Sequence, residues 1–185
     1  MPITTLDNRC ALVVIDLQKG IVGLPTAHPA SGVVQRAAAL ARAFRERGLP
    51  VALVNVVGAA PGRTDPQPAR PAPPADWTEL VPELDVQPQD IRVSKKTWGA
   101  FTGTGLEAQL RERGVTQVVL CGICTSIGVE SSARQAHELG FNVTVVTDAV
   151  TDTSVQAHEN SVSRIFPRLG ETGVAQDVLS RLEGR

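Results

Sequence analysis

The sequence lacks an excess of charge of either sign, which excludes partners that bind mainly through electrostatic attraction. Its 185 residues include 18 Lys and Arg and 19 Asp and Glu, so the net charge is -1 at pH 7. Such a chain creates no strong field that would attract nucleic acid or an anionic membrane surface. We therefore expect a small-molecule substrate, no nucleic acid and no membrane.

Long apolar runs and cysteines are also scarce. No stretch approaches the ~20 apolar residues of a membrane span, and the first residues form neither a basic nor an apolar leader. The three cysteines, including Cys10 in an apolar run, show no disulfide framework. These features predict a cytoplasmic protein, and the length predicts a single domain over residues 1–185.

Short apolar runs alternate with amphipathic segments along the chain. This alternation is typical of a Rossmann-like α/β fold with three α/β/α layers, a six-stranded, mainly parallel sheet and a site at its carboxyl edge. No Gly-x-Gly-x-x-Gly or phosphate loop follows the first strand, and we expect no cofactor. The predicted strands cover residues 10–16, 51–57, 91–95, 118–121, 141–147 and 172–175, and the predicted helices cover 31–47, 104–113, 154–166 and 176–182, with one more after 125.

One long segment, residues 58–90, has little periodicity and contains eight of the thirteen prolines. Structureless segments of this length inside a domain are usually functional. Because predicted strands lie on both sides, a lid or rim over the site is favoured over a linker between domains.

Three chemically active side chains are predicted near the carboxyl ends of strands. Asp16 ends the first strand, Lys95 or Lys96 ends the third, and Cys124 lies in the turn after the fourth. A carboxylate, an ammonium and a thiol at a helix N-terminus would supply an acid/base, a charge stabiliser and a nucleophile. A strand-end Asp equally often caps a loop or helix, so the partners of Asp16 decide its role.

Four segments together resemble the isochorismatase-like hydrolase family, over residues 11 to about 170. They are Ala11-Leu-Val-Val-Ile-Asp16-Leu-Gln, Lys95-Lys-Thr-Trp-Gly-Ala-Phe101-Thr-Gly-Thr104-Gly-Leu, Gly122-Ile-Cys-Thr125-Ser-Ile-Gly128-Val and Val146-Thr-Asp148-Ala. The resemblance implies a six-stranded parallel sheet between helices, a homo-oligomer (dimer or tetramer) and a small-molecule hydrolase whose site uses Asp and Lys. The family Lys stands six residues before the Phe, which selects Lys95, and a non-proline cis peptide is expected between Cys124 and Thr125.

The position of the family nucleophile is where this chain departs from the amidase members. Those members place a Cys three residues after the Thr, and here that residue is Gly128, whereas Cys124 lies one residue before the Thr. Members similar to isochorismatase itself carry Gly there and cleave an enol ether, with the Asp as general acid. Their usual Tyr-Ala-His run is replaced here by Cys124, Thr125 and Ser126, which leaves the substrate open.

The predicted site therefore contains catalytic Asp16 and Lys95, with Cys124 as an alternative nucleophile. Residues expected to bind the substrate or an oxyanion are Thr125, Ser126, Gly128, Asn55, Trp98 and Phe101. Thr125 and Ser126 are also predicted N-caps of the helix that follows the fourth strand. The leading function is a hydrolase that uses Asp acid/base catalysis without a Cys nucleophile, on enol ethers or related C–O and C–N bonds. The alternatives are an amidohydrolase that uses Cys124 and a catalytically silent binding member.

Metal and redox chemistry are disfavoured. Nicotinamidase-like relatives bind zinc through an Asp and two His in the loop after the second strand, and that loop has no His here, so no metal site is expected. His137 and His158 are interpreted as helix-surface residues. Cys121 ends a buried strand, so it is interpreted as a core residue and not as half of a redox pair with Cys124. The arginines of the 31–47 helix, Arg45 among them, are interpreted as a solvated face.

Overall fold

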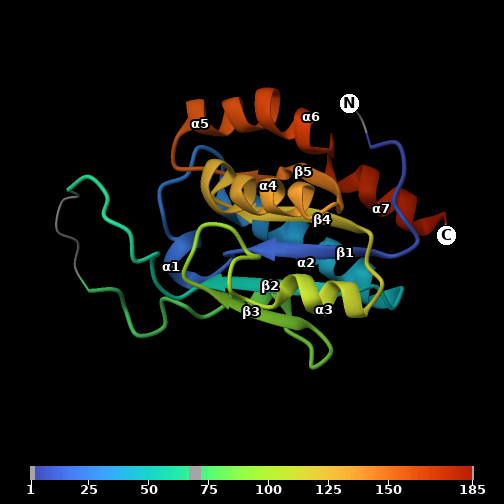
Figure 1. Ribbon diagram of the computed structural model, residues 1–185, viewed down its shortest axis with the longest axis horizontal. Coiled ribbons are helices and arrows are strands. Elements are labelled where there is room, and N and C mark those ends of the chain that lie inside the picture. The colour runs from blue at the N-terminus through green and yellow to red at the C-terminus, as the bar shows by residue number, and fades with distance from the viewer. Residues whose placement is uncertain (1–2, 67–71, 185) are drawn as a thin grey trace.

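A single six-stranded sheet forms the centre of the molecule (Figure 1). The computed structural model describes residues 3–66 and 72–184. The strand order is β3-β2-β1-β4-β5-β6, and every neighbouring pair is parallel. The strands are β1 (Cys10–Ile15), β2 (Val51–Val56), β3 (Ile91–Lys95), β4 (Gln117–Ile123), β5 (Asn142–Thr151) and β6 (Glu171–Gly173).

Helices cover both faces of the sheet. On one face, α2 (Ala30–Glu46) and α7 (Ala175–Glu183) pack in one hydrophobic cluster with the sheet. On the other face, α3 (Leu106–Glu112), α4 (Glu130–Glu138) and α6 (Phe166–Leu169) contribute to a second cluster. The remaining helical pieces are α1 (Lys19–Val22), α5 (Val155–Asn160), a 3-10 turn η1 (Pro82–Leu84) and the π-helical turns η2 (Thr125–Val129) and η3 (Ser161–Ile165).

The central strands β1 and β4 are apolar runs because helices bury them on both sides. Every residue of β1 and of β4 is buried, as expected for the middle of a parallel sheet. From β1 the chain crosses to β2 on one side, and β4 lies on the other side of β1. The strand order therefore changes direction between β1 and β4, and the carboxyl edge at this point is where open α/β sheets bind ligands.

The predicted fold class is confirmed, and the strand predictions differ mainly at their ends. The fifth strand was expected to end at residue 147, but β5 continues to Thr151. The helix predicted to stop near Pro167 in fact passes through η3 and ends at Leu169. Pro167 is the second residue of α6, which directly follows the π-helical turn η3, and the helix ends two residues later.

The described part of the 58–90 segment has two different halves. Residues from Asp76 to Leu80 are tied to the body, because Gln18 bonds both Val56 and the carbonyl of Trp77, while Lys19 pairs with Asp76. Residues 58–66 run away from the body beyond the carboxyl ends of the strands (Figure 1). Residues 67–71 lie outside the described part, and a lid or rim stays a prediction.

Candidate active site

Asp16 and Lys95 meet at the carboxyl edge of the sheet. The Lys95 Nζ atom lies 2.7 Å from Asp16 Oδ2, and both side chains are buried. The two residues follow β1 and end β3, so strand β2 lies between the elements that position them. Lys95 also donates to the Thr97 carbonyl at 3.2 Å. Lys95, the lysine that the resemblance selects, is thus the one that pairs with Asp16, and Lys96 forms no ion pair with it.

The environment of the Asp16 carboxyl group favours its protonated form. Its Oδ1 atom is buried without a hydrogen-bond partner among the described residues. Burial raises the pKa of Asp16 to about 6, although the Lys95 ammonium acts in the opposite direction. A carboxyl group with this pKa exists in both protonation states near neutral pH, which suits a general acid or base.

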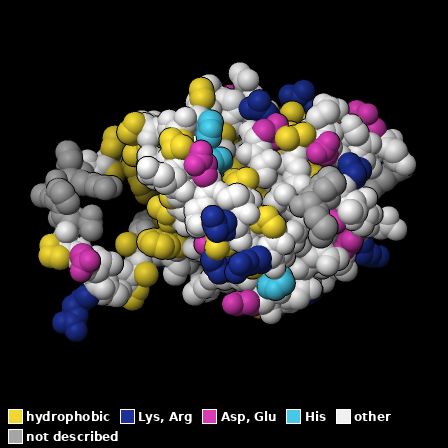
Figure 2. Space-filling model, turned by 90° about the horizontal axis from the view of Figure 1, so that it is seen from above, with side chains coloured by type: hydrophobic (Ala, Val, Ile, Leu, Met, Phe, Trp, Pro, Cys, Tyr) yellow, Lys and Arg dark blue, Asp and Glu magenta, His cyan; other side chains and the backbone are white. Residues whose placement is uncertain are grey.

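A cavity of about 650 Å³ opens beside this ion pair. Its apolar wall comes from α1 and the turns after β2 and β4, and Trp98, 66% exposed, lies at its rim. Figure 2 shows hydrophobic side chains gathered at this end of the molecule, next to the projecting segment. The lining residues are Asp16, Ile21, Leu24, Pro25, Val56, Gly58, Ala59, Lys95, Lys96, Thr97, Trp98, Ile123, Cys124, Ile127, Gly128 and Thr153.

The turn after β4 differs from the prediction in two respects. The cis peptide bond joins Ile123 to Cys124, one residue before the expected place. The prediction that Thr125 or Ser126 caps the helix is wrong, because the N-cap is Cys124 and has no side-chain cap bond. The chain enters α4 through the π-helical turn η2. This wide turn supplies Ile127 and Gly128 to the cavity wall.

Thr125 and Ser126 face other parts of the protein. Thr125 is fully buried, and its hydroxyl lies 2.9 Å from His158 Nδ1. The Ser126 N–H and hydroxyl both donate to Asp152 Oδ2, at 2.7 and 2.9 Å. His158 is therefore buried, and its interpretation as a helix-surface residue is wrong. Burial and the neighbouring His28 lower the pKa of His158.

Gly128 is the part of the turn nearest to the ion pair. A Cβ atom added there would lie 3.0 Å from Asp16 Oδ2 and 2.9 Å from Ile15 Cγ2. Both distances are shorter than a normal contact, so the space beside the carboxylate accommodates only the glycine hydrogen. Residue 128, where the resemblance implies the amidase nucleophile, therefore brings no side chain to the Asp16 carboxylate.

The Cys124 thiol lines the cavity but lacks the environment of an activated nucleophile. Burial, with contributions from Asp152 and Asp16, raises its pKa to about 11. The thiol therefore stays protonated near neutral pH, whereas catalytic cysteines have a lowered pKa. Cys121 is fully buried in β4, with a pKa raised by burial to about 12, and both thiols are free.

Besides Thr125 and Ser126, two further residues predicted to bind substrate lie outside the cavity lining. Asn55 Nδ2 donates to the Thr78 carbonyl, and its Oδ1 accepts from Ser94, so its amide fastens the 58–90 segment. Phe101 packs against Phe141, with ring centroids 6.0 Å apart. The structure thus brings together Asp16, Lys95, Cys124, Gly128 and Trp98, and leaves Thr125, Ser126, Asn55 and Phe101 aside.

The sequence reasoning missed the apolar wall and the second lysine of the cavity. Ile21, Leu24 and Pro25 follow the Asp16 motif closely, but their short segment has no periodicity that would indicate a pocket wall. The sequence pattern presents Lys96 only as an alternative to Lys95 at the end of the third strand. Its place in the lining depends on the fold of the turn after β2, which the sequence pattern does not predict.

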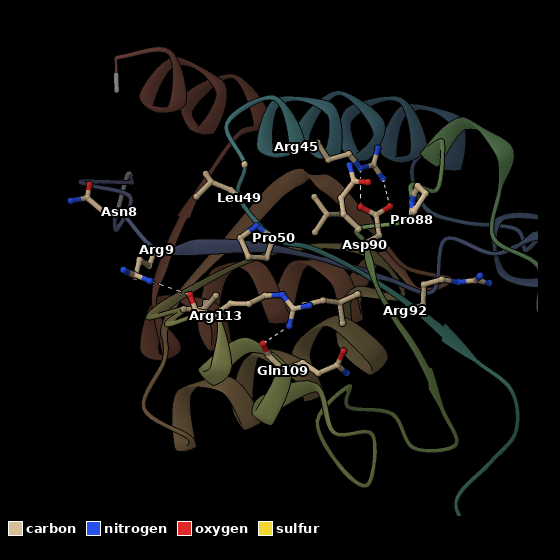
Figure 3. A pocket seen from close by; sticks show the side chains of 15 residues that line it. Asn8, Arg9, Arg45, Leu49, Pro50, Pro88, Asp90, Arg92, Gln109 and Arg113 are labelled. Atoms are coloured by element: carbon tan, nitrogen blue, oxygen red, sulfur yellow. Dashed lines mark hydrogen bonds and ion pairs between the residues drawn. The ribbon is translucent and has the colours of Figure 1, made fainter.

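A larger cleft of about 910 Å³ lies at the opposite, amino edge of the sheet (Figure 3). Its arginines are partly occupied: Arg45 makes a bidentate pair with Asp90, and Arg113 donates to the Gln109 carbonyl. Arg45 is therefore not part of a solvated face, contrary to the prediction. Arginines near helix C-termini also offset the negative end of the helix dipole. Because its arginines have these structural roles, this cleft lacks a set of reactive side chains that meet as Asp16 and Lys95 do.

Residues 3–66 and 72–184 contain no cluster of metal-binding side chains. No group of three or more His, Cys, Asp or Glu side chains in these residues is arranged to hold a metal ion. In the same residues no helix is both long and apolar enough to cross a membrane.

Comparison with known proteins assigns the family. A family model described as the isochorismatase domain matches residues 10–177. The chain belongs to the isochorismatase family of hydrolases. It is 46% identical over 181 residues to the isochorismatase family protein YecD of Escherichia coli O157:H7, covering 93% of this chain and 95% of YecD.

Solved structures support the same assignment. An isochorismatase family protein from Burkholderia thailandensis superposes with a TM-score of 0.91 and 47% identity, covering 97% of this chain and 98% of that chain. The N-carbamoylsarcosine amidase from Thermoplasma acidophilum is similar at a TM-score of 0.73 and 27% identity, covering 90% of this chain and 96% of that chain. The family thus includes a named amidase, which makes the fate of the nucleophile position important for this chain.

Proposed function

We propose that this chain is a small-molecule hydrolase in which Asp16 transfers protons and no side chain attacks the substrate. The observation that supports it most directly is the contact between Gly128 and Asp16. A side chain at residue 128 would touch the carboxylate, so this close contact fits only glycine, and glycine supplies no nucleophile. The chain then belongs to the members with Gly in place of the nucleophilic Cys.

The proposed reaction is hydrolysis of an enol ether or a related C–O or C–N bond. For an enol ether, protonated Asp16 gives its proton to the vinyl carbon, which leaves an oxocarbenium ion and the Asp16 carboxylate. Water adds to that ion, and its proton returns to Asp16 as the resulting hemiketal breaks down to a carbonyl compound and an alcohol. Lys95 stabilises the carboxylate between the two transfers, because its ammonium lies 2.7 Å from Oδ2.

Hydrogen-bond donors for the substrate come from fewer groups than the sequence predicted. The Ser126 N–H is occupied by Asp152. Ser126 and Thr125 therefore act as positioning residues in this proposal, since they fix η2 to Asp152 and His158. Direct contact with substrate is left to Asp16, Gly128, Trp98 and the apolar wall.

The predicted homo-oligomer, a dimer or a tetramer, is a separate part of this proposal. Analytical ultracentrifugation measures the oligomeric state and tests it.

The test replaces Asp16 and follows pH. We expect Asp16→Asn to reduce turnover about 10²- to 10⁴-fold on an enol-ether substrate found by screening, as for loss of a general acid. In the unchanged protein kcat/KM is expected to fall above pH ~6, because the acid form of a group with a pKa of about 6 is lost there. Undiminished turnover in Asp16→Asn, or kcat/KM that rises through this pH range, would contradict the acid role.

Cys124 as the nucleophile of an amidohydrolase is the second candidate. It is supported by the position of the thiol in the cavity wall and by the similarity to an amidase. It is opposed by the raised pKa of the thiol. Alkylation with iodoacetamide and the variant Cys124→Ala separate the candidates, since loss of amide hydrolysis in step with thiol modification would favour Cys124. A binding member without turnover would show no hydrolysis of esters, amides or enol ethers.

A further inference from the structure

The cavity beside Asp16 contains one positive charge without a partner. Three charged side chains line it in the described residues: Asp16, Lys95 and Lys96. Asp16 and Lys95 neutralise each other at 2.7 Å. Lys96 makes no ion pair and no hydrogen bond within residues 3–66 and 72–184, so the cavity has an excess of one positive charge when Asp16 is ionised. This excess is local, because the whole chain has a net charge of -1.

Lys96 is held at the rim by packing of its aliphatic stem. A Cβ atom added at Gly58 would lie 3.4 Å from Lys96 Cγ and 3.8 Å from Cδ, so the stem runs over the backbone of the turn after β2. Long basic side chains commonly rest their methylene groups on protein surface and keep the charged end free. The stem of Lys96 therefore lies on one side of the cavity, and its ammonium, which has no partner in the described residues, is accessible to a ligand.

The rest of the cavity is mostly apolar. Ile21, Leu24 and Pro25 form one wall, and Ile127 comes from η2. Trp98 stands at the rim with 66% of its surface exposed. Its indole ring thus offers an apolar surface to a ligand. Such a lining favours a ligand with a hydrophobic body, and orientation comes from the few polar groups.

We propose that Lys96 determines substrate specificity in this site by binding a carboxylate of a substrate that has an apolar body. The inference rests on the proposed function, because it takes the cavity beside Asp16 as the substrate site. Lys95 is unable to play this part, since its ammonium is buried and already pairs with Asp16. A carboxylate at Lys96 would also orient the apolar body toward Trp98 and the reacting bond toward Asp16.

The experiment compares two unreactive compounds of the same shape by calorimetric titration. Cyclohexanecarboxylate carries the charge, and its neutral isostere acetylcyclohexane replaces one carboxylate oxygen by a methyl group. The unchanged protein is expected to bind the carboxylate about two- to fivefold more tightly than the ketone, the ratio that a partly exposed ion pair supplies. This preference should shrink as NaCl is added, because the pair is accessible to solvent.

Variants identify the residue responsible. Lys96→Met keeps the stem over Gly58 but removes the charge, and we expect it to abolish the preference while ketone binding is retained. Lys96→Arg should restore the preference. Arg92→Met is the matched control, because Arg92 is an exposed cation on β3, the strand that ends just before Lys96, and lies outside this cavity; its loss should leave the preference unchanged.

Two results would overturn the inference. One is equal binding of the carboxylate and the ketone by the unchanged protein, and the other is a preference that persists in Lys96→Met. Neither measurement requires turnover, because neither compound is hydrolysed. Failure of the Asp16 mechanism therefore appears in the activity of Asp16→Asn, and failure of the Lys96 inference appears in these titrations.

Discussion

At the scale of single residues, the site depends on one buried carboxyl group with two different oxygen atoms. Asp16 Oδ2 is bound by Lys95, while Oδ1 has no partner in the described residues. An unpaired buried polar atom costs free energy, so its presence in a cavity wall indicates a place for substrate or water. Gly128 packs against the Oδ2 side of this carboxyl so closely that no side chain fits there.

The close packing around Gly128 leads to a prediction for Gly128→Ala. The added methyl group would meet Ile15 Cγ2 at 2.9 Å and Asp16 Oδ2 at 3.0 Å, and the branched Ile15 in the core has little freedom to move. We expect a loss of about 1–3 kcal/mol in the free energy of unfolding, as for other overpacked cores. Activity should fall as well, because the methyl group displaces the carboxyl.

Urea denaturation and steady-state kinetics measure these two effects. Gly62→Ala is the control, because nothing lies within 4 Å of a Cβ atom added at Gly62. If Gly128→Ala matched the unchanged protein in stability and turnover, the close approach of this turn to Asp16 would be disproved.

At the scale of elements, the segment after β2 is fixed to the carboxyl edge by side chains of the segment after β1. Gln18 is completely buried and bonds the backbone of both Val56 and Trp77. The Trp77 ring packs on Gly20, where no side chain intervenes. The β1 motif therefore provides both Asp16 and the attachment of the loop that borders the cavity.

This attachment is tested by Gly20→Ala. A Cβ atom at Gly20 would lie 1.9 Å from Trp77 Cδ1, so the indole must leave its place. We expect faster proteolytic cleavage between residues 58 and 77, because this part loses its contact with α1. Gly23→Ala serves as the control, since its Cβ atom would meet only a backbone carbonyl at a normal 3.5 Å. Equal cleavage rates of the two variants would show that Trp77 does not secure the segment.

The elements themselves were predictable from the sequence, because strands such as β1 and β4 are continuous apolar runs buried on both faces. The rule that parallel strands end at one edge predicted that Asp16 would meet Lys95 or Lys96, and the family resemblance selected Lys95. The environments of His158 and Arg45 were not predictable, because each depends on a partner brought by tertiary packing, Thr125 in one case and Asp90 in the other. Helical spacing indicates which face a residue occupies but does not reveal what that face contacts.

At the scale of the whole molecule, the sheet concentrates its unfavourable electrostatics at the carboxyl edge. At the amino edge the Arg45 and Asp90 pair is also little exposed, while both faces of the sheet pack in apolar clusters. Burying an ion pair costs desolvation energy that the attraction between the charges does not always offset. The Asp16 and Lys95 pair is therefore expected to lower the stability of the fold, and the proposed acid role of Asp16 gives a reason for its presence.

The cost of this pair should appear as a dependence of stability on pH. The pKa of Asp16 is raised from 3.8 to about 6 on folding, so the native state binds more protons than the unfolded state between these values. The contribution of Asp16 to stability is therefore fully present below pH ~4 and is lost as pH rises through ~6. The loss is expected to reach about 3 kcal/mol, since each unit of difference in pKa corresponds to about 1.4 kcal/mol.

The double variant Asp16→Leu with Lys95→Met removes both charges and keeps similar volumes. Its free energy of unfolding, measured by urea denaturation at pH 4, 5, 6 and 7, is expected to rise relative to the unchanged protein as the pH increases. At pH 7 it should equal or exceed that of the unchanged protein, as replacement of buried ion pairs by apolar residues often does. Lys95→Met alone is the control and should lose stability at pH 7, because it leaves the Asp16 carboxylate buried without its cation. A stability difference that stays constant from pH 4 to 7 would mean that Asp16 has the same pKa in the folded and unfolded chains, and its raised pKa would then not explain proton transfer in this site.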